Sequence, residues 1–370
     1  MKYKYKVCVY AICKNEEKNI DRWYRSVSEA DEIYVLDTGS SDNSVNKLRE
    51  YGVFVKEVVI NPFRFDVARN KSLEMVPGDA DICVCVDLDE IYRPGWREKM
   101  EMVWKKDTNR LKHTYNWKIV DSKPVISFYY EKIHSRHNYK WVHPVHEVLE
   151  TSLSNEKVVV AEDVILDHYP DEKKSRSNYL SLLELSVKED ADDDRNRHYL
   201  GREYMYYGMW EKGIQTLMDY LKMDRATWKD ERAASMRYIA RCYNNLGRVD
   251  EARLWYLKAI DEAPYLRDGY VEIGIFEYSF QNYLEVINYL IKALMIKVHQ
   301  KTYINEEFSW DYTIDNLLSV CYYYIGLYEE SLYYIDRAIL KDKNNEMLIK
   351  NREFVLDKLK EVDWLLLWFF

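Results

Sequence analysis

The sequence predicts an α/β domain with a mostly parallel central sheet, followed by an all-α region of stacked helical hairpins. Short apolar strands alternate with helices in the first part of the chain, a pattern typical of a doubly wound parallel sheet. Glycines recur at similar intervals in the second part, which indicates repeated helical units. The 370 residues are long enough for two domains, and 47% hydrophobic with 32% charged residues is ordinary for a folded protein.

The net charge and the distribution of cysteines make some classes of partner and site less favoured. A formal net charge of −9 argues against a nucleic-acid backbone as the main partner. The six cysteines are dispersed in apolar runs without metal-pair spacing, so we expect buried, reduced thiols. The N-terminal residues lack the apolar core of a signal peptide, and no run approaches the length of a transmembrane segment. We therefore expect a cytoplasmic protein, in a cell or an infected host.

The first elements predict three strands whose polar ends meet at one edge of the sheet. Helices are expected over about 19–27 and 43–51, and the strands are Val7–Ile12, Ile33–Leu36 and Val53–Val55. The first strand runs into Asn15 and Glu16, and the second into Asp37 and a polar loop. Because the carboxyl ends of parallel strands share one edge, we expect these loops to converge.

A fourth strand carries the strongest chemical signal. The apolar run Ile82–Val86 reads as a strand buried on both faces, and it leads directly into Asp87, Asp89 and Glu90. If the strand geometry persists, the side chains of Asp87 and Asp89 point to the same face of the sheet. Two carboxylates this close repel each other unless a cation lies between them. Mg²⁺ or Mn²⁺ completed by a phosphate is the natural partner. The alternative is a solvated turn that caps the next helix.

A basic residue precedes this strand by one element. Residues after Asn61 should open a helix that carries Arg69 and ends by Pro77. A lone arginine on a helix is usually a surface charge. Its position next to the carboxylate strand favours a diphosphate contact instead.

Four motifs in this region resemble family 2 glycosyltransferases, which have the GT-A fold. Their order and spacing match the family, most closely its bacterial and phage-type branch with tetratricopeptide repeats, which includes peptide S-glycosyltransferases. The matching segments are 11–16 (AICKNE), 37–42 (DTGSSD), 65–70 (FDVARN) and 87–90 (DLDE). The sequence departs from relatives at Leu88, where a small residue is common.

The resemblance implies a nucleotide-sugar pocket and a divalent metal ion, Mn²⁺ or Mg²⁺. It assigns Asp89 as the direct metal ligand, with Asp87 at the ribose and the metal. Asp37 would meet the uracil or ribose, and Arg69 the nucleotide side of the donor. The pocket would be lined by Ala11, Asn15, Glu16, Asp37, Arg69, Asp87 and Leu88.

The segment 96–149 is expected to contain a helix, antiparallel strands and a histidine cluster. We expect the helix over 96–106 and strands at 111–120, 125–130 and around Ile133. Histidines 134, 137, 143 and 146 could suggest zinc, but they lack a matching cysteine or a regular helical pairing.

Relatives carry an arginine, an aromatic residue and His-Glu at matching positions, here Arg136, Trp141, His146 and Glu147. An inverting transfer needs a base, for which Glu147 is our choice and Glu90 the reserve. Trp141 offers a face for stacking on a sugar or an acceptor ring. The alternative is that His146 and Glu147 are a structural pair at the start of a strand.

The end of the first domain predicts a closing hairpin. Two apolar runs, 158–160 and 164–166, flank a polar pair and lead to His168. By the resemblance His168 matches a late histidine that GT-A enzymes often supply to the metal, for which neutral imidazole is suitable. A capping or surface histidine is the alternative.

The second half predicts tetratricopeptide-like repeats. Gly208, Gly247, Gln281 and Gly326 hold equivalent places at spacings that bracket the period of about 34 residues. We expect a GT-A domain at 1–170, a helical linker at 171–197, repeats at 198–345, and a capping helix with an apolar tail at 346–370. A homodimer through the repeats or the tail is a hypothesis.

Together these features predict a metal-dependent inverting glycosyltransferase that uses a nucleotide-sugar, with a UDP-sugar favoured. The acceptor could be a peptide or protein side chain, a glycan, or a modified base in nucleic acid. One alternative is an inactive repeat scaffold that binds a protein partner. Another is a nucleotidyltransferase, which usually needs a glycine-rich loop after the first strand, where this chain has Cys13, Lys14, Asn15 and Glu16.

Overall fold

The computed structural model describes residues 4–170 and 179–368, with side chains described up to residue 361. The chain forms two compact units. The first ends at Ala191 and includes Lys301–Tyr303, and the second comprises Asp192–Gln300 and the residues from Ile304 onward. The division falls inside the segment 171–197 that was expected to link two domains. No helix in the described part of the chain is long and apolar enough to cross a membrane.

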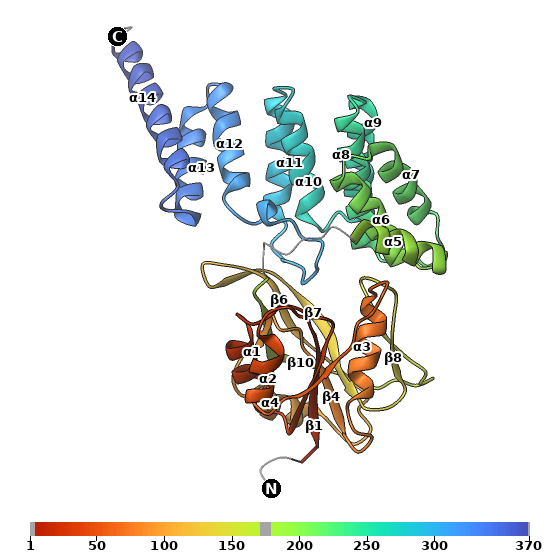
Figure 1. The fold of residues 1–370 in the computed structure, drawn as a ribbon. Coiled ribbons are helices and arrows are strands. Elements are labelled where there is room, and N and C mark those ends of the chain that lie inside the picture. The colour runs from red at the N-terminus through yellow and green to blue at the C-terminus, as the bar shows by residue number, and fades with distance from the viewer. Residues whose placement is uncertain (1–3, 171–178, 369–370) are drawn as a thin grey trace. The chain divides into compact units, whose positions relative to one another are not determined.

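The first unit is built on a large mixed sheet (Figure 1). Its described strands lie in the order β3-β2-β1-β4-β7-β6-β10-β5. Strands β3, β2, β1 and β4 run parallel, β7 is antiparallel to β4 and β6, and β10 is parallel to β6. The bounds are β1 Val7–Cys13, β2 Glu32–Asp37, β3 Phe54–Glu57, β4 Ile82–Cys85, β5 Glu90–Tyr92, β6 Arg110–Val120, β7 Lys123–Ser135 and β10 Val158–His168. The predicted α/β fold class is confirmed.

Helices cover both faces of the sheet, and a small hairpin lies beside α3. In Figure 1, α1, α2 and α4 lie on one side of the sheet and α3 on the other. The helices are α1 Ile20–Val27, α2 Ser44–Glu50, α3 Phe65–Glu74, α4 Trp96–Val103 and α5 Tyr179–Glu189. The hairpin pairs β8 Tyr139–Val142 with β9 Val148–Thr151. Helix α4 is shorter than the expected 96–106, because the chain turns extended at Trp104.

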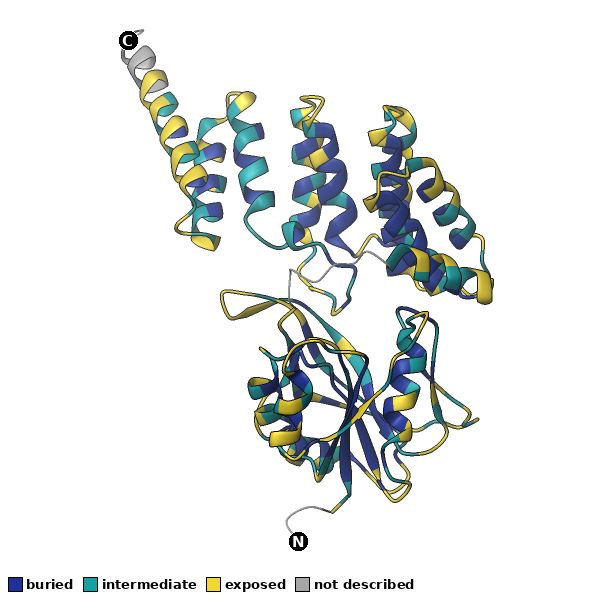
Figure 2. Ribbon diagram, viewed as in Figure 1, coloured by how far each residue is buried: buried dark blue, intermediate teal, exposed yellow. Residues whose placement is uncertain are grey.

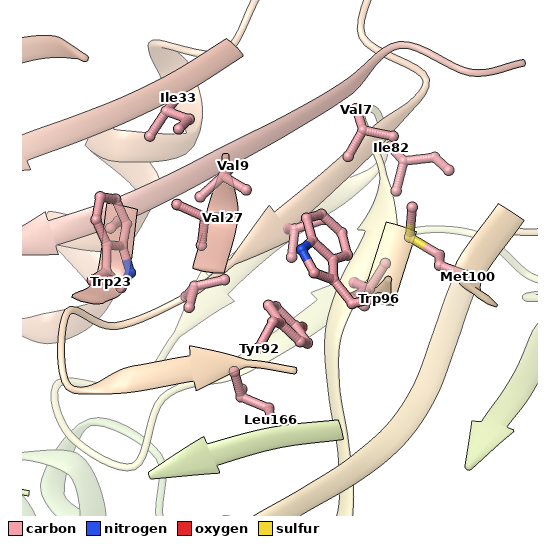
Figure 3. Close-up of a cluster of buried hydrophobic side chains, with 14 of the residues drawn as sticks. Val7, Val9, Trp23, Val27, Ile33, Ile82, Tyr92, Trp96, Met100 and Leu166 are labelled. Carbon is pink, nitrogen blue, oxygen red and sulfur yellow. The ribbon is translucent and has the colours of Figure 1, made fainter. Parts of the chain in front are cut away.

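The central strands are buried on both faces, as their continuous apolar runs predict (Figure 2). In β4, Ile82 and Val84 face a core that includes Trp23 of α1 and Trp96 of α4 (Figure 3). The alternate residues Cys83 and Cys85 face a second core. All six cysteines are buried and unpaired with each other, as expected. Burial on both sides fixes the strand register and therefore the positions of the loops at its ends.

Two strand predictions for the later part of the sheet are wrong. Residues 158–166 do not form a hairpin but one strand, β10, whose pairing with β6 shifts between Ala161 and Ile165. A β-bulge absorbs the polar residues between the two apolar runs without reversing the chain. Likewise the predicted strands at 125–130 and around Ile133 are one strand, β7, with irregular pairing to β6.

The second unit consists of successive antiparallel helix pairs, as the repeats predict. In the described residues the pairs are α6 Asp194–Tyr206 with α7 Trp210–Leu221, α8 Lys229–Asn245 with α9 Val249–Glu262, α10 Arg267–Tyr278 with α11 Tyr283–Met295, and α12 Thr313–Tyr324 with α13 Tyr328–Lys341. The helix α14 Glu346–Trp368 follows. Gly208, Gly247 and Gly326 each end the first helix of a pair with positive φ, and Gln281 does the same at φ 61°. The tetratricopeptide-like pattern is confirmed.

A long connection explains the widest repeat spacing. Between α11 and α12 the chain runs through residues 296–312, which include a short 3₁₀ helix at Glu307–Ser309. The guanidinium of Arg267 lies 3.7 Å from the ring centroid of Trp310, and it donates to the carbonyl of Ile296. This insertion lengthens one repeat without interrupting the helix pairs.

The linker and the tail are only partly described. Helix α5 ends at Glu189, and Asp193 caps α6 by accepting the N–H of Asn196 at 3.1 Å, so the acidic run forms a turn. The first part of the predicted helical linker, 171–178, lies outside the described residues. The side chains of the apolar tail, Trp364–Phe370, also lie outside them.

Candidate functional site

The loops after β1 and β2 are bonded to each other at the carboxyl edge of the sheet, as predicted. The Asp37 carboxylate accepts the backbone N–H groups of Gly39 and Ser40, both at 2.9 Å, and the Ser40 hydroxyl. Asn15 adopts φ 56°, and its side-chain oxygen accepts the N–H of Ser41 at 2.7 Å. The buried Glu16 accepts from the Asn19 side chain. These contacts fix a polar rim in which Asp37 organises its own loop.

The carboxylates after β4 lie in a turn, which corrects the expectation that Asp87 and Asp89 share one face. The strand ends at Cys85, and the Glu90 N–H donates to the Asp87 carbonyl at 2.9 Å. The Glu90 carboxylate in return accepts the Asp87 N–H, also at 2.9 Å. A turn breaks the two-residue alternation of a strand, so the two aspartates point to different partners.

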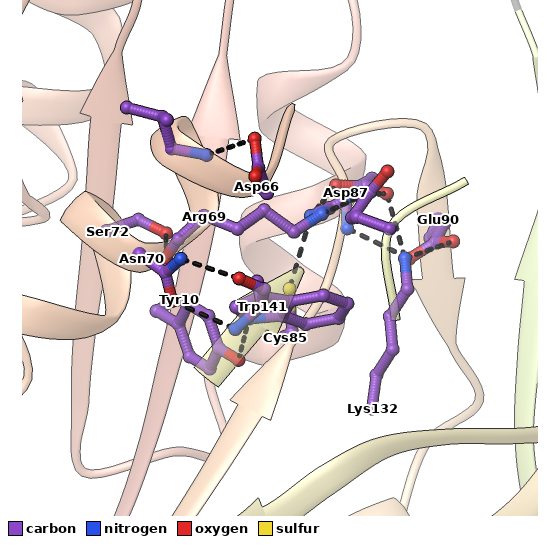
Figure 4. Close-up of polar contacts among 12 residues, drawn as sticks. Tyr10, Asp66, Arg69, Asn70, Ser72, Cys85, Asp87, Glu90, Lys132 and Trp141 are labelled. Carbon is purple, nitrogen blue, oxygen red and sulfur yellow. Dashed lines mark hydrogen bonds and ion pairs between the residues drawn. The ribbon is translucent and has the colours of Figure 1, made fainter. Parts of the chain in front are cut away.

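Asp87 is held by two cationic side chains (Figure 4). Arg69 donates to both of its oxygens, at 2.8 and 2.9 Å, and Lys132 donates to Oδ2 at 3.0 Å. Burial raises the pKa of Asp87, but the charges of Arg69 and Lys132 outweigh this effect and hold the pKa well below its ordinary value. Asp87 is therefore an ionised hub of the site.

Arg69 also binds the predicted base. Its Nε donates to Glu147, which lies in the loop before β9, and its Nη1 lies 3.2 Å from the Cys85 sulfur. The guanidinium carbon is 5.1 Å from the ring centroid of Trp141. Carboxylates on two sides and an indole on the third offset the cost of burying the arginine.

The β8–β9 hairpin is attached to α3 through Asn70. Its side-chain amide donates to the Trp141 carbonyl at 2.8 Å and accepts the Trp141 N–H at 2.9 Å (Figure 4). The N–H of Phe65 donates to the carbonyl of Pro144. These bonds bring Glu147 and Arg69 together, although 78 positions separate them in sequence.

Lys132 was missed by the sequence reasoning. Its side chain is 6% exposed, and Nζ lies 3.6 Å from Glu90 and 4.5 Å from the Tyr130 ring centroid. The signal in the sequence was a lysine within the largely aromatic and apolar segment FYYEKIH, which is expected to be a buried strand. Burial, with the charges of Asp87 and Asp89, raises the pKa of Glu90, and Lys132 opposes that rise.

Asp89 and His168 form a separate pair. The His168 Nδ1 lies 3.0 Å from the Trp117 carbonyl, which directs its Nε2 to Asp89 at 3.5 Å. The Tyr169 N–H donates to the Asp89 carbonyl at 2.8 Å. Burial lowers the pKa of His168, but the hydrogen bond and charge of Asp89 outweigh it, so the net pKa is raised.

A divalent ion fits this pair by the chemistry of its donors. A carboxylate and a neutral imidazole nitrogen both suit Mn²⁺, and such ions commonly keep water and substrate phosphate as their remaining ligands. Groups of three or more histidine, cysteine, aspartate or glutamate side chains placed for a metal are absent from the described residues. Arg69 and Lys132 donate to the two oxygens of Asp87, and the role of Asp87 as a metal ligand stays a prediction.

Several predicted contact residues lie elsewhere. Arg136 donates to the carbonyls of Val76 and Pro77 beside the first residues of β4, at the opposite edge of the sheet. The side chains of Ala11 and Leu88 lie in the hydrophobic core. Trp141 is 2% exposed, so its ring supports Arg69 and is not available for stacking on a sugar. These positions correct the expectations for Arg136, Ala11, Leu88 and Trp141.

Glu90 and the histidines also have internal partners. Glu90 is 2% exposed and bonded within its own turn, which corrects its expected role as a reserve base. His146 contacts the Tyr179 hydroxyl. His134 contacts the Tyr10 hydroxyl at 2.8 Å, and burial lowers its pKa to about 3. The four clustered histidines are not gathered into a metal site among the described residues.

Comparison with known proteins identifies the domain. Residues 8–119 match the family model described as Glycosyl transferase family 2. This match over the first part of the chain supports a glycosyltransferase activity in general. A search of the curated proteins finds no match.

Solved structures similar to this chain include MamA and two proteins named as TPR proteins. MamA has 17% identity and a TM-score of 0.36, covering 45% of this chain and 82% of its own. A thermophilic TPR protein from Thermus thermophilus has 15% identity and a TM-score of 0.36, with 49% and 90% covered. The C-terminal part of a TPR repeat-containing protein from Cytophaga hutchinsonii has 15% identity and a TM-score of 0.41, with 50% and 67% covered.

Proposed function

We propose that this protein is a metal-dependent, inverting glycosyltransferase that transfers a sugar from a nucleotide-sugar, with a UDP-sugar as the favoured donor. The observation that carries the proposal is the separation of the carboxylates after β4. Asp87 is neutralised by Arg69 and Lys132, whereas Asp89 faces His168 at 3.5 Å. A site of this kind offers one carboxylate and one imidazole to a cation beside an edge lined by Asp37 and Asn15.

The contacts of the donor-side residues support the roles that we propose for them. Asp37 and Asn15 hold the loops after β1 and β2, where a nucleoside would be bound by hydroxyl and imide contacts. Asp89 and His168 would hold the divalent ion. When bound, that ion supplies positive charge to the leaving diphosphate. Arg69 forms ion pairs with both Asp87 and Glu147 and thereby holds the two carboxylates in place.

Glu147 is the proposed general base. Single displacement with inversion requires a carboxylate on the acceptor side that removes the acceptor proton as the bond forms. The Glu147 carboxylate forms an ion pair with Arg69, and its side chain is 11% exposed. Glu147→Gln should abolish transfer while donor binding persists. The product should have the anomeric configuration opposite to that of the donor.

The acceptor is proposed to be a peptide or protein side chain, because helical repeats provide extended binding surfaces. A glycan would be the second choice. The net charge of −9 weakens the case for a modified base in nucleic acid.

The decisive experiment is a panel of nucleotide-sugars tested for Mn²⁺-dependent hydrolysis and for thermal stabilisation of the full chain. The expected result is hydrolysis of one donor that EDTA abolishes and Mn²⁺ restores. Asp89→Ala should remove both activity and metal dependence. Asp79→Ala, at a side chain 73% exposed near Lys6, is the matched control and should behave like the unmodified protein.

The same panel separates the alternatives. An inactive scaffold would show neither hydrolysis nor stabilisation by any donor. A nucleotidyltransferase would instead release pyrophosphate from a nucleoside triphosphate and a sugar phosphate. Full activity in Asp89→Ala would refute the assignment of the site.

A further inference from the structure

Strand β7 contains an extra residue next to the carboxylate turn. In its pairing with β6, Leu111 lies opposite Ile133, but His113 lies opposite Tyr130. Two steps along β6 therefore match three steps along β7, which places a β-bulge at Glu131 and Lys132. Bulges commonly redirect a side chain near a functional site. Here the bulge directs Lys132 inward and Glu131 to the Lys112 ammonium, at 2.7 Å.

The ammonium of Lys132 lies between the two ends of the carboxylate turn (Figure 4). It is 3.0 Å from Oδ2 of Asp87 and 3.6 Å from Oε1 of Glu90. Asp87 and Glu90 are the first and last residues of the turn, whose backbone bond closes at 2.9 Å. Arg69 binds Asp87 and Glu147. Among the described residues, Lys132 is thus the cation that bridges both ends of the turn.

Charge repulsion explains why such a bridge is needed. Asp87, Asp89 and Glu90 place three carboxyl groups within four residues, and like charges this close repel each other. Asp89 lies inside the turn, where its carbonyl accepts the Tyr169 N–H and its carboxylate faces His168. Any opening of the turn would move Asp89 away from His168.

We propose that Lys132 is a positioning residue that holds the Asp87–Glu90 turn closed and thereby sets the position of Asp89. It acts through Asp87 and Glu90 and does not itself contact the donor. The link to catalysis rests on the proposed glycosyltransferase function. The link to the geometry of the turn does not.

The test is hydrogen–deuterium exchange of the full chain, read at the amides of Asp87 and Glu90. Lys132→Met should increase their exchange by about tenfold or more, the equivalent of one hydrogen bond to a charged group. Lys132→Arg should restore much of the protection. Lys112→Met is the control, because this lysine on the neighbouring strand is 39% exposed and pairs with Glu131 on the outside.

The proposal would be overturned if the amides of Asp87 and Glu90 were as well protected from exchange in Lys132→Met as in Lys112→Met. Exchange at the amides of β1 reports whether the domain remains folded. If Lys132→Met does not fold, Lys132→Met combined with Asp87→Asn removes one charge of each sign. That double variant should fold and still exchange faster than the unmodified protein at Glu90, and normal protection there would also overturn the proposal.

Turnover provides a second readout. In a protein that hydrolyses a nucleotide-sugar, Lys132→Met should lower kcat about 10- to 100-fold, and Lys132→Arg should recover part of it, as expected of a residue that orients a ligand-binding group. Absence of hydrolysis in the unmodified protein would refute the proposed function. The exchange experiment uses neither donor nor metal, so it would still decide the role of Lys132.

Discussion

The Arg69 guanidinium forms a two-bond pair with the Asp87 carboxylate, from Nη1 to Oδ1 at 2.8 Å and from Nη2 to Oδ2 at 2.9 Å. This geometry uses the planar fork of the arginine, which a lysine cannot reproduce. The same guanidinium donates through Nε to Glu147. One side chain on α3 therefore connects the carboxylate turn after β4 with the loop before β9.

Removing this arginine should destabilise the first unit. Arg69→Met leaves Asp87 and Glu147 without their shared cation. The expected loss is about 3 kcal/mol, the low end for a broken buried pair, because a quarter of the Asp87 side chain is exposed. Urea unfolding of the full chain measures it. Lys71→Met, at an exposed position of the same helix, should change stability by about 0.5 kcal/mol or less. Equal stability of both variants would contradict the structural role.

The two aspartates of the turn should separate stability from activity. Asp87→Asn should lower stability because it weakens bonds to Arg69 and Lys132. Asp89→Asn should change stability by only about 0.5 kcal/mol, since its carboxylate is partly exposed and faces His168, yet it should abolish donor hydrolysis. Unfolding curves and hydrolysis rates on the same preparations provide the comparison. The reverse pattern would show that the roles of the two carboxylates are exchanged.

Buried histidines should make the first unit sensitive to acid. Burial lowers the pKa of His113 to about 4 and that of His134 to about 3. Unfolded histidine titrates near a pKa of about 6.5. The unfolded chain therefore binds more protons below that pH, and stability falls as the pH drops from about 6.5 toward 4. Each group contributes a slope of up to about 1.4 kcal/mol per pH unit.

The variant His113→Phe tests this assignment. It retains a ring beside Tyr92 and Tyr130 but removes the titrating group. Urea unfolding at several pH values between 7.5 and 4.5 should show a shallower loss of stability for the variant. Parallel curves for the two proteins would contradict the prediction.

Close helix packing in the second unit depends on Gly201. A Cβ added there would lie 2.5 Å from Cγ of Leu217 on α7, which is closer than real Cβ contacts. Gly201→Ala should therefore destabilise the unit by about 1–3 kcal/mol despite the better helix propensity of alanine.

A double-mutant cycle checks the mechanism. Leu217→Ala creates a cavity at a fully buried position and destabilises the unit alone. Combined with Gly201→Ala, it provides room for the new methyl group. The double variant should be more stable than the sum of the single effects implies. Strict additivity would show that the two side chains do not meet.

The sequence predicted those features that depend on local pattern. The residues of strand Ile82–Cys85 are apolar on both faces of the sheet. Such a strand is buried on both sides, so it lies in a sheet that other elements cover on both faces. Asp37, Asn15 and the carboxylates follow parallel strands, so their place at one edge required no further information. The recurring glycines marked the helix pairs, because each ends a helix with positive φ.

Tertiary structure decided which of those side chains are paired with each other. From the sequence alone, Trp141 is an aromatic residue that could stack on a ligand. In the structure, the hairpin that carries Trp141 packs on α3 through Asn70, and the ring is buried. Glu147 meets Arg69 for the same reason. Such contacts join segments far apart in sequence, and no periodicity of the chain encodes their distance.

Lys132 shows most clearly which contacts could not be predicted from the sequence. The sequence presents it as one lysine among aromatic residues, and strand alternation alone cannot place it, because a bulge shifts the register between Tyr130 and Ile133. Only the assembled sheet puts its ammonium between Asp87 and Glu90. The sequence by itself determined that carboxylates gather at the end of β4. The three-dimensional fold determined that internal cations neutralise Asp87, while Asp89 faces His168, because charge neutralisation depends on distances between strands.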